Sequence, residues 1–174
     1  MMLAAKFTKQ NPVGWLMSEK LNGWRAYWDG ANLRTRTWAI IPTPAYFTAQ
    51  LPADVALDGE IHAGRGGFSV IQSLCQSGDF TDPRWEQVRY SVFDFPTTEL
   101  LPIESRLNLA RKLAVGRQVD FVEHVLIERE DAMWSRFGEV IRAKGEGLVI
   151  KRPASYYEFD RSSDWLKVKP AGVS

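Results

Sequence analysis

The 174-residue sequence predicts an α+β fold, and three observations support this class. Runs in which apolar and polar residues alternate, as in strands, make up much of the chain. Helical spacing of apolar residues appears between these runs. The two kinds of segment do not alternate regularly, as they would in a parallel α/β fold. Because the length suits one sizeable hydrophobic core, we expect a single domain over residues 1–174.

The predicted strands begin with a hairpin. Residues 26–28 and 33–38 form its two strands, and the Asp-Gly pair at 29–30 is typical of the connecting turn. Further strands are predicted at 55–63, 89–95, 148–152 and 165–169. Most of the residues with candidate chemistry lie in or beside these strands.

Three segments have the apolar spacing of amphipathic helices. The first covers residues 68–75 and is predicted to end at Gly78. The second covers residues 103–113. The third covers residues 133–141 and is predicted to be closed by Gly145.

Composition excludes several kinds of site. Cys75 is the only cysteine, so an internal disulfide and a cysteine zinc site are excluded, and its apolar neighbours indicate a buried thiol. No apolar run approaches the ~20 residues that cross a bilayer, and the N-terminal apolar stretch is too short for a signal peptide. We therefore expect a cytoplasmic protein. The net charge of +1 excludes a uniformly basic coat but not a local basic groove.

Two lysines near the C-terminus alternate with apolar residues. A strand through this segment would place Lys167 and Lys169 on one face, about 7 Å apart, where two ammonium groups can flank a phosphate. Taken alone, the pattern is more typical of an amphipathic edge strand with solvated lysines. Glu146 precedes the apolar segment 148–152, where a carboxylate can hold Mg²⁺ or simply lie at the surface.

Two acidic residues interrupt the apolar segment 57–61. Asp58 and Glu60 would point to one face of a strand, and burying both without partners would be costly. Gly59 would permit close approach of a backbone or a ligand, although an Asp-Gly hairpin turn explains the segment equally well. In the segment 90–95, Phe93 and Phe95 would share a face, either in the core or stacked on a nucleobase.

The N-terminal quarter contains a lysine in a predicted turn and a basic–aromatic patch. A lysine such as Lys20 becomes nucleophilic only when it is deprotonated, and an ordinary turn lysine is the commoner interpretation of its position. Arg34, Arg36 and Trp38 would share one face of the predicted strand 33–38. Such a patch suits contact with a phosphate backbone.

In combination, these segments resemble the nucleotidyltransferase domain of ATP-dependent DNA ligases, especially the small viral and bacterial forms. RNA ligases and mRNA capping enzymes share the fold of that family. The resemblance implies a covalent nucleotidyltransferase fold, similar to ATP-grasp, in which antiparallel sheets are flanked by helices. Each match is loose, but six of them occur in order. The matching segments are 20–23, 36–38, 57–60, 92–94, 146–151 and 166–169.

The resemblance implies a reaction. Lys20 is similar to the lysine that attacks the α-phosphorus of ATP and keeps AMP as a phosphoramidate. The AMP then passes to the 5′-phosphate of nicked duplex DNA, the implied partner, and we expect a monomer. Mg²⁺ or Mn²⁺ is the implied metal, with Glu146 and Glu60 as its ligands.

The resemblance also implies roles around the nucleotide. Arg25 is similar to the residue that reaches the ribose and the nick phosphate, Glu60 to the ribose-binding acid, and Phe93 to the ring that stacks on adenine. Lys167 and Lys169 are similar to the α-phosphate lysines. The complete implied nucleotide-binding set is Glu19, Arg25, Glu60, Phe93, Arg161, Lys167 and Lys169. On the DNA side, Arg36 is similar to the arginine that contacts the 5′-phosphate, with Arg34 and Trp38 beside it.

Two features depart from the family pattern. The lysine motif of the family reads Lys-x-Asp-Gly, whereas Asn22 occupies the third position here. Asparagine keeps the size of aspartate but not its charge, so we expect slow self-adenylation. The sequence also stops just past Lys169, where family members usually continue into an OB domain, and we expect none in this chain.

Two alternative functions stay open on the sequence alone. One is an RNA ligase or a capping-type nucleotidyltransferase. The other is a non-catalytic nick-binding module in which Asn22 marks a decayed site. The segments 64–68 and 161–163 favour a small DNA ligase over the first alternative, and retention of Lys20 and Glu146 counts against the second.

Overall fold

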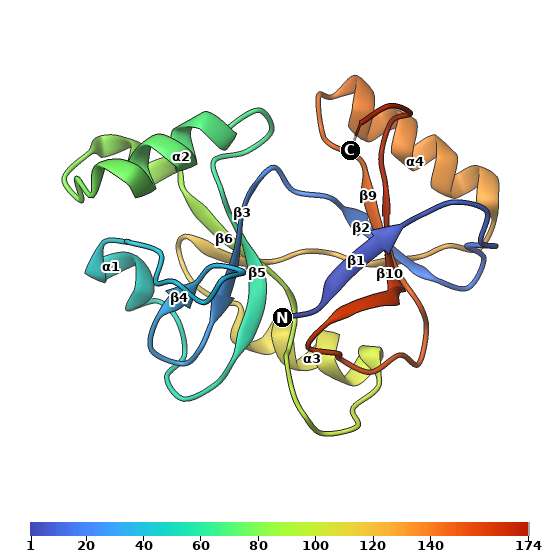
Figure 1. Ribbon diagram of the computed structural model, residues 1–174, viewed down its shortest axis with the longest axis horizontal. Coiled ribbons are helices and arrows are strands. Elements are labelled where there is room, and N and C mark those ends of the chain that lie inside the picture. The colour runs from blue at the N-terminus through green and yellow to red at the C-terminus, as the bar shows by residue number, and fades with distance from the viewer. Residues whose placement is uncertain (174) are drawn as a thin grey trace.

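The alternating segments assemble into two five-stranded sheets. The computed structural model describes residues 1–173, and Figure 1 shows the two sheets side by side with the helices packed around them. The first sheet has the order β1 (Leu3–Lys6), β10 (Arg161–Val168), β9 (Leu148–Lys151), β2 (Leu16–Glu19) and β8 (Val125–Leu126). The second has the order β4 (Leu33–Arg34), β3 (Gly23–Trp28), β5 (Leu57–His62), β6 (Arg89–Asp94) and β7 (Val119–Phe121).

The predicted α+β class is confirmed, with one refinement to the sheets. Most neighbouring strands are antiparallel, as expected, but β1 pairs with β10 and β6 pairs with β7 in parallel. The chain passes from β2 in the first sheet to β3 in the second through residues 20–22 alone. Lys20 therefore lies where the chain crosses between the two sheets.

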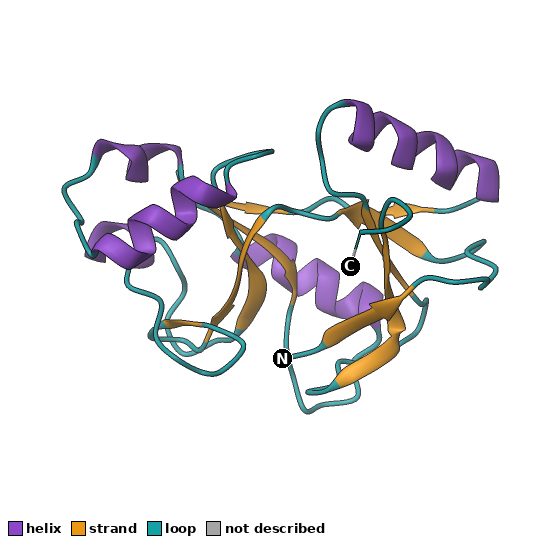
Figure 2. Ribbon diagram, turned by 45° about the horizontal axis from the view of Figure 1, so that its top comes forward, coloured by secondary structure: helices purple, strands orange, loops and turns teal. Residues whose placement is uncertain are grey.

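The three predicted helices are confirmed. They are α2 (Phe68–Ser77), α3 (Ile103–Leu113) and α4 (Glu130–Arg142), shown in purple in Figure 2. Gly78 ends α2 in the left-handed conformation, as predicted (φ 65°). At the end of α4 the left-handed residue is Lys144, and Gly145 follows it, donating its N–H to the Val140 carbonyl (2.8 Å). None of the described helices is long and apolar enough to cross a membrane.

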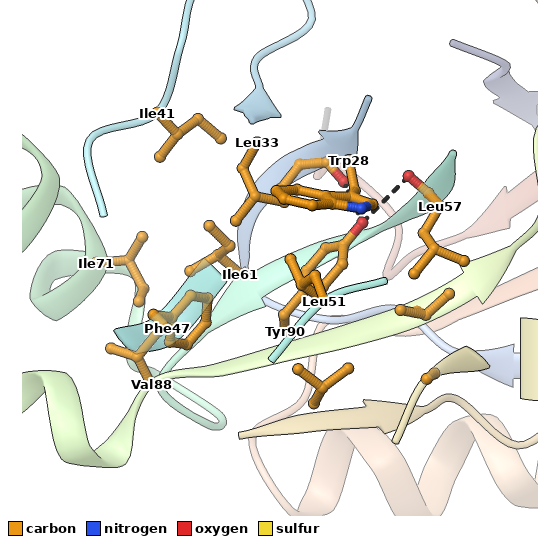
Figure 3. Close-up of a cluster of buried hydrophobic side chains, with 14 of the residues drawn as sticks. Trp28, Leu33, Ile41, Phe47, Leu51, Leu57, Ile61, Ile71, Val88 and Tyr90 are labelled. Atoms are coloured by element: carbon orange, nitrogen blue, oxygen red, sulfur yellow. Dashed lines mark hydrogen bonds between the residues drawn. The ribbon is translucent and has the colours of Figure 1, made fainter. Parts of the chain in front are cut away.

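Apolar residues of the second sheet form the larger core. Ala26 and Trp28 alternate with Arg25 and Tyr27 along β3, and the first pair packs into this core with Ile61 and other residues shown in Figure 3. On the opposite face of β3, Arg25 lies over the rings of Phe93 and Trp165, between the two sheets. Cys75 is buried in the same core, which confirms the predicted buried thiol, and burial raises the pKa of this thiol to about 11.

The first sheet has its own core beneath α4. Leu166 and Val168 of β10 pack there with Leu148, Ile150 and other apolar residues. Lys167 lies between them in sequence and so points to the other face. A small third cluster, which includes Met2 and Trp165, packs with Phe93 where the two sheets meet.

The predicted strand 33–38 is wrong beyond its second residue. β4 ends at Arg34, and a turn follows in which Thr35 N–H bonds to the Ala39 carbonyl (2.8 Å). Trp38 has a positive φ of 71°, a backbone conformation incompatible with a strand. Arg34, Arg36 and Trp38 therefore do not share a strand face.

Several short elements were not predicted. These are β1, β2, β7 and β8, the helix α1 (Ala45–Thr48) and a 3₁₀ helix, η1 (Pro83–Gln87). Segments of two to five residues are too short to show a periodic pattern, and their partners in the fold define them.

Candidate active site

A cavity of about 340 Å³ lies between the two sheets. Residues of β1, β2, β9 and β10 line it from the first sheet, residues of β3, β5 and β6 from the second, and Lys20 and Leu21 from the crossing loop. Nearly all of the residues predicted to bind nucleotide line this one cavity. They are Glu19, Arg25, Glu60, Phe93, Arg161 and Lys167, together with Lys20 and Arg36.

Backbone and side-chain bonds hold Lys20 at this cavity. Its N–H bonds to the Gly147 carbonyl (2.9 Å), which continues the pairing of β2 with β9 by one residue. Its Nζ donates to Glu146, which follows α4 and precedes β9. The predicted turn between strands is confirmed, and the lysine and the candidate metal ligand are in direct contact.

A β-bulge places Phe93 in the cavity. Asp58 pairs with Asp94 and Gly59 with Val92, so Phe93 is the extra residue of β6. The expected shared face with Phe95 is wrong, because Phe95 packs against the core of the second sheet and Phe93 against the cluster between the sheets. The bulge breaks the alternation on which that expectation was based.

Gly59 lies in the middle of β5, so the Asp-Gly hairpin turn considered for this segment does not form. A Cβ atom on Gly59 would lie 2.5 Å from the Ser91 carbonyl oxygen. The predicted close approach is therefore between two backbones, and glycine is needed for it.

Arg25 is turned inward, toward Asp58. Its Nε and Nη2 donate to the two carboxylate oxygens of Asp58 at 2.7 and 2.6 Å, and Nη2 also donates to the Met2 carbonyl. The guanidinium lies 4.9 Å from the centre of the Phe93 ring. Asp58 is fully buried and also accepts a hydrogen bond from the Tyr157 hydroxyl (2.6 Å). These partners offset the cost of burying its charge.

Glu60 faces the cavity in a poorly solvated position. It accepts a hydrogen bond from Gly23 N–H (3.1 Å). Burial raises the pKa of its carboxyl to about 7, against the opposing effects of Arg25 and Lys20. Neutral and ionised forms therefore coexist near neutral pH in the absence of a cation.

We predict that Glu60→Gln increases stability at high pH. The pKa of Glu60 is higher in the folded protein than the unfolded value of 4.5. The stability that protonated Glu60 contributes to the fold is therefore fully present below pH 4.5 and is lost as the pH rises through about 7. When the pH is raised from 5 to 8, the unfolding free energy of Glu60→Gln should increase by about 1 to 3 kcal/mol relative to that of wild type. Urea denaturation in a chelating buffer measures this. Glu139→Gln, on an exposed side chain of α4, is the control, and equal pH dependence in Glu60→Gln and wild type would contradict the prediction.

Cations converge at one side of the cavity. Burial lowers the pKa of Lys167, and the neighbouring charges of Lys169, Arg161, Lys20 and Arg36 lower it further. These five residues come from β10, its C-terminal end, the crossing loop and the turn after β4. Positive charge is therefore concentrated here although the net charge of the chain is only +1. Such a concentration favours binding of a polyphosphate.

The predicted basic–aromatic patch divides into two parts. Arg36 lines the main cavity and also a second, more open hollow of about 700 Å³ that adjoins it through Gly23 and Arg25. Arg34 instead pairs with Asp29 (2.5 Å), and its guanidinium lies 5.3 Å from the centre of the half-exposed Trp38 ring. Of the three residues, only Arg36 lines the cavity.

Sequence reasoning assigned no role to Lys151, which also lines the cavity. Lys151 is buried, donates from Nζ to the Phe93 carbonyl (2.6 Å) and lies 4.2 Å from the centre of the Trp165 ring. Burial lowers its pKa to about 8, although Asp94 opposes the shift. Asp94 in turn pairs with buried Arg106 at 2.8 Å. A lysine inside an apolar strand was the available sequence signal.

Glu60 in the cavity lining and Glu146 in contact with Lys20 supply carboxylate oxygens, the ligand type that divalent cations such as Mg²⁺ prefer. The charge of Glu146 adds a small part to the effect of burial that raises the pKa of Glu60, so the two carboxylates lie near one another. Within residues 1–173, no cluster of three or more His, Cys, Asp or Glu side chains is placed to hold a metal by itself. Two carboxylates with oxygens left for phosphate and water are typical of Mg²⁺ sites.

Comparisons with known proteins show the family of the chain. A family model for the ATP dependent DNA ligase domain matches residues 2–169. A DNA ligase of Haemophilus influenzae is 34% identical over 173 residues, which cover 98% of this chain and 63% of that protein. The chain thus spans less than two thirds of the length of this relative.

Solved structures give the same result. A structure of Lig E DNA ligases, from a study of DNA binding with a minimal scaffold, has a TM-score of 0.88 and 33% identity and covers 97% of this chain and 68% of that one. A Chlorella virus DNA ligase-adenylate has a TM-score of 0.76 and 24% identity, covering 97% and 66%, and supports the fold. The chain therefore belongs to the ATP-dependent DNA ligase domain family.

Proposed function

We propose that this chain is the adenylation domain of an ATP-dependent DNA ligase, which transfers AMP from ATP to the 5′-phosphate of nicked duplex DNA and seals the nick. One observation carries the proposal. Lys20 lies at a cavity that also presents an aromatic ring, Phe93, and a group of cations around Lys167. Action as a monomer in the cytoplasm is part of the same proposal.

The proposed reaction has three displacements at phosphorus. Lys20 Nζ attacks the α-phosphorus of ATP, so that an N–P bond forms, the bond to pyrophosphate breaks and Lys20 loses a proton. Nζ donates a hydrogen bond to Glu146, and it has to give up its extra proton to solvent before its lone pair can attack. An oxygen of the DNA 5′-phosphate then attacks the phosphorus of the bound AMP, so that a P–O bond forms, the N–P bond breaks and Lys20 regains a proton. Finally the 3′-hydroxyl attacks the phosphorus of the 5′-phosphate, loses its proton to solvent and releases AMP.

Charge neutralisation is the main demand of each displacement. We assign the α-phosphate to Lys167 and Lys169 and the remaining phosphates to Arg161 and neighbouring cations. A divalent cation, Mg²⁺ or Mn²⁺, would be held by Glu60 and Glu146 and would supply further positive charge at the phosphates. Lys167 is suited to its role because the pKa shift caused by burial and like charges is relieved when an anion binds.

The remaining assignments concern the nucleoside. Phe93 is proposed to stack on adenine, since the bulge presents its ring to the cavity. Glu60 is proposed to accept a bond from the ribose, and Glu19 to form part of the wall beside Lys20. Arg25 is proposed to reach the ribose edge from its position between Asp58 and Phe93.

Incubation with ATP and Mg²⁺ tests the proposal directly. Intact-mass analysis should show the gain of one AMP, and peptide mapping should place it on Lys20. An adduct formed with GTP in preference to ATP would instead indicate a capping-type enzyme. Binding of nicked DNA with no adduct would indicate a nick-binding module.

We expect Arg36→Ala to weaken binding of nicked DNA more than binding of ATP. Arg36 lines both the nucleotide cavity and the adjoining hollow, so it is placed at the proposed junction with the 5′-phosphate. Loss of one phosphate contact should reduce the salt dependence of binding by about one unit of slope. Fluorescence anisotropy with 5′-phosphorylated nicked duplex at several salt concentrations measures this.

Arg34→Ala is the matched control. Arg34 and Trp38 are also proposed to lie near the DNA, but the charge of Arg34 is offset by Asp29 (2.5 Å). Its removal should therefore change the salt dependence less. An equal loss in both variants, or unchanged binding in Arg36→Ala, would exclude the special position of Arg36.

A further inference from the structure

The loop after β5 reaches across to the first sheet. Arg65, in the loop 63–67, donates from Nε and Nη2 to the two carboxylate oxygens of Glu19, both at 2.8 Å. Glu19 is the last residue of β2 and immediately precedes Lys20. This paired geometry, formed between residues 46 positions apart, joins the two sheets beside the nucleotide cavity.

The backbone of this loop is set in place by its neighbours. Gly64 and Gly66 have positive φ angles of 80° and 72°, which glycine adopts without strain. His62 Nδ1 accepts a hydrogen bond from Gly64 N–H (3.2 Å), and its Nε2 lies 2.6 Å from Ser91 Oγ. Arg65 is thus presented from a structured loop.

Stability does not account for the Arg65–Glu19 pair. The Arg65 side chain is 41% exposed and that of Glu19 is 20% exposed, and such surface pairs contribute only about 0 to 1 kcal/mol to folding. Electrostatics at the cavity gives a better reason. Glu19 and Glu60 both line the cavity, and Glu146 contacts Lys20 there. An uncompensated Glu19 would add negative charge where a polyphosphate has to bind.

We infer that Arg65 is a positioning residue for nucleotide binding, which neutralises Glu19 and keeps its carboxylate away from Lys20 and the phosphates. Lys20 is thereby left to its contact with Glu146. The inference rests on the proposed function, because it takes a nucleotide polyphosphate as the ligand of this cavity. It assigns Arg65 no contact with the nucleotide itself.

A rescue experiment tests this role. ATP binding by calorimetry and the rate of lysyl-AMP formation against ATP concentration are measured for wild type, Arg65→Ala, Arg65→Lys and the double variant Arg65→Ala/Glu19→Gln. Arg65→Ala should raise the Kd and KM for ATP roughly tenfold through charge repulsion, with the maximal rate and the melting temperature little changed. Arg65→Lys should lie between the two. The double variant should return close to the wild-type Kd.

Arg84→Ala is the control for loss of an exposed arginine. Arg84 is 43% exposed and pairs with Asp82 within the 3₁₀ helix region, so its removal should leave ATP binding unchanged. Unchanged binding in Arg65→Ala would overturn the inference. Failure of the Glu19 substitution to restore binding would also overturn it, because Arg65 would then bind the phosphates directly.

The two readouts separate this inference from the proposed function. If no variant forms an adduct but ATP affinity follows the expected order, the proposed enzymatic reaction fails and the role of Arg65 in binding stands. If wild type forms the adduct and the Arg65 variants bind ATP as wild type does, the reaction stands and the inference fails.

Discussion

Replacing Lys20 by alanine should abolish the covalent attachment of AMP and leave the fold intact. Lys20 lies in the crossing loop, its side chain is 26% exposed, and the ion pair that it forms is with Glu146, whose side chain is 31% exposed. Its loss should therefore cost little stability, whereas it removes the nitrogen that is proposed to attack ATP. Intact-mass spectrometry after incubation with ATP and Mg²⁺ checks the adduct, and thermal melting checks the fold.

Lys20→Arg is the matched control, because it keeps the positive charge beside Glu146 without a nucleophilic amine. It should also form no adduct. Both variants should still seal DNA that is already adenylated, since that step does not use the amine. Covalent AMP on the alanine variant would show that another residue is the nucleophile, and the assignment of Lys20 would be abandoned.

Arg106→Ala should cause the largest loss of stability. The Arg106 guanidinium is fully buried, pairs with buried Asp94 at 2.8 Å, and donates to the carbonyls of Leu101 and Ser155, both at 2.7 Å. Its removal leaves Asp94 buried with Lys151 as its other cation, 3.8 Å away. Breaking a buried pair typically costs about 3 to 5 kcal/mol, and urea denaturation followed by circular dichroism measures the loss.

Arg111→Ala on the same helix, α3, is the control. Arg111 pairs with Glu123, and both side chains are more than half exposed, so the loss should stay below about 1 kcal/mol. Similar losses in the two variants would contradict the prediction. Because Asp94 follows Phe93 in β6, Arg106→Ala should also weaken ATP binding wherever enough protein stays folded to measure it.

The positions of the helices and the order of the motifs could be predicted because their signals are local. The spacing of apolar residues between 68 and 75 predicts α2, and Gly78 predicts its end. The family resemblance likewise depends on short segments in a fixed order, and it predicts roles for Lys20 and Glu146, whose side chains are in contact in the structure. Such features are encoded within a few neighbouring residues.

The partners of the charged residues could not be predicted in the same way. Arg25 pairs with Asp58, Arg34 with Asp29 and Arg65 with Glu19. Of these pairs, only Arg34 and Asp29 are close in sequence. Which carboxylate an arginine meets depends on how strands from distant parts of the chain are aligned. Local alternation contains no information about that alignment.

By itself, therefore, the sequence determined the α+β class, the three long helices, the family and the residues around which its chemistry is proposed. Only the tertiary structure decided that the strands divide between two sheets, that a bulge turns Phe93 into the cavity, and that Arg65 crosses to Glu19. The physical reason is the range of the interactions. Periodicity and capping act over a few residues, whereas strand pairing, bulges and cross-sheet ion pairs arise from contacts between residues far apart in the chain.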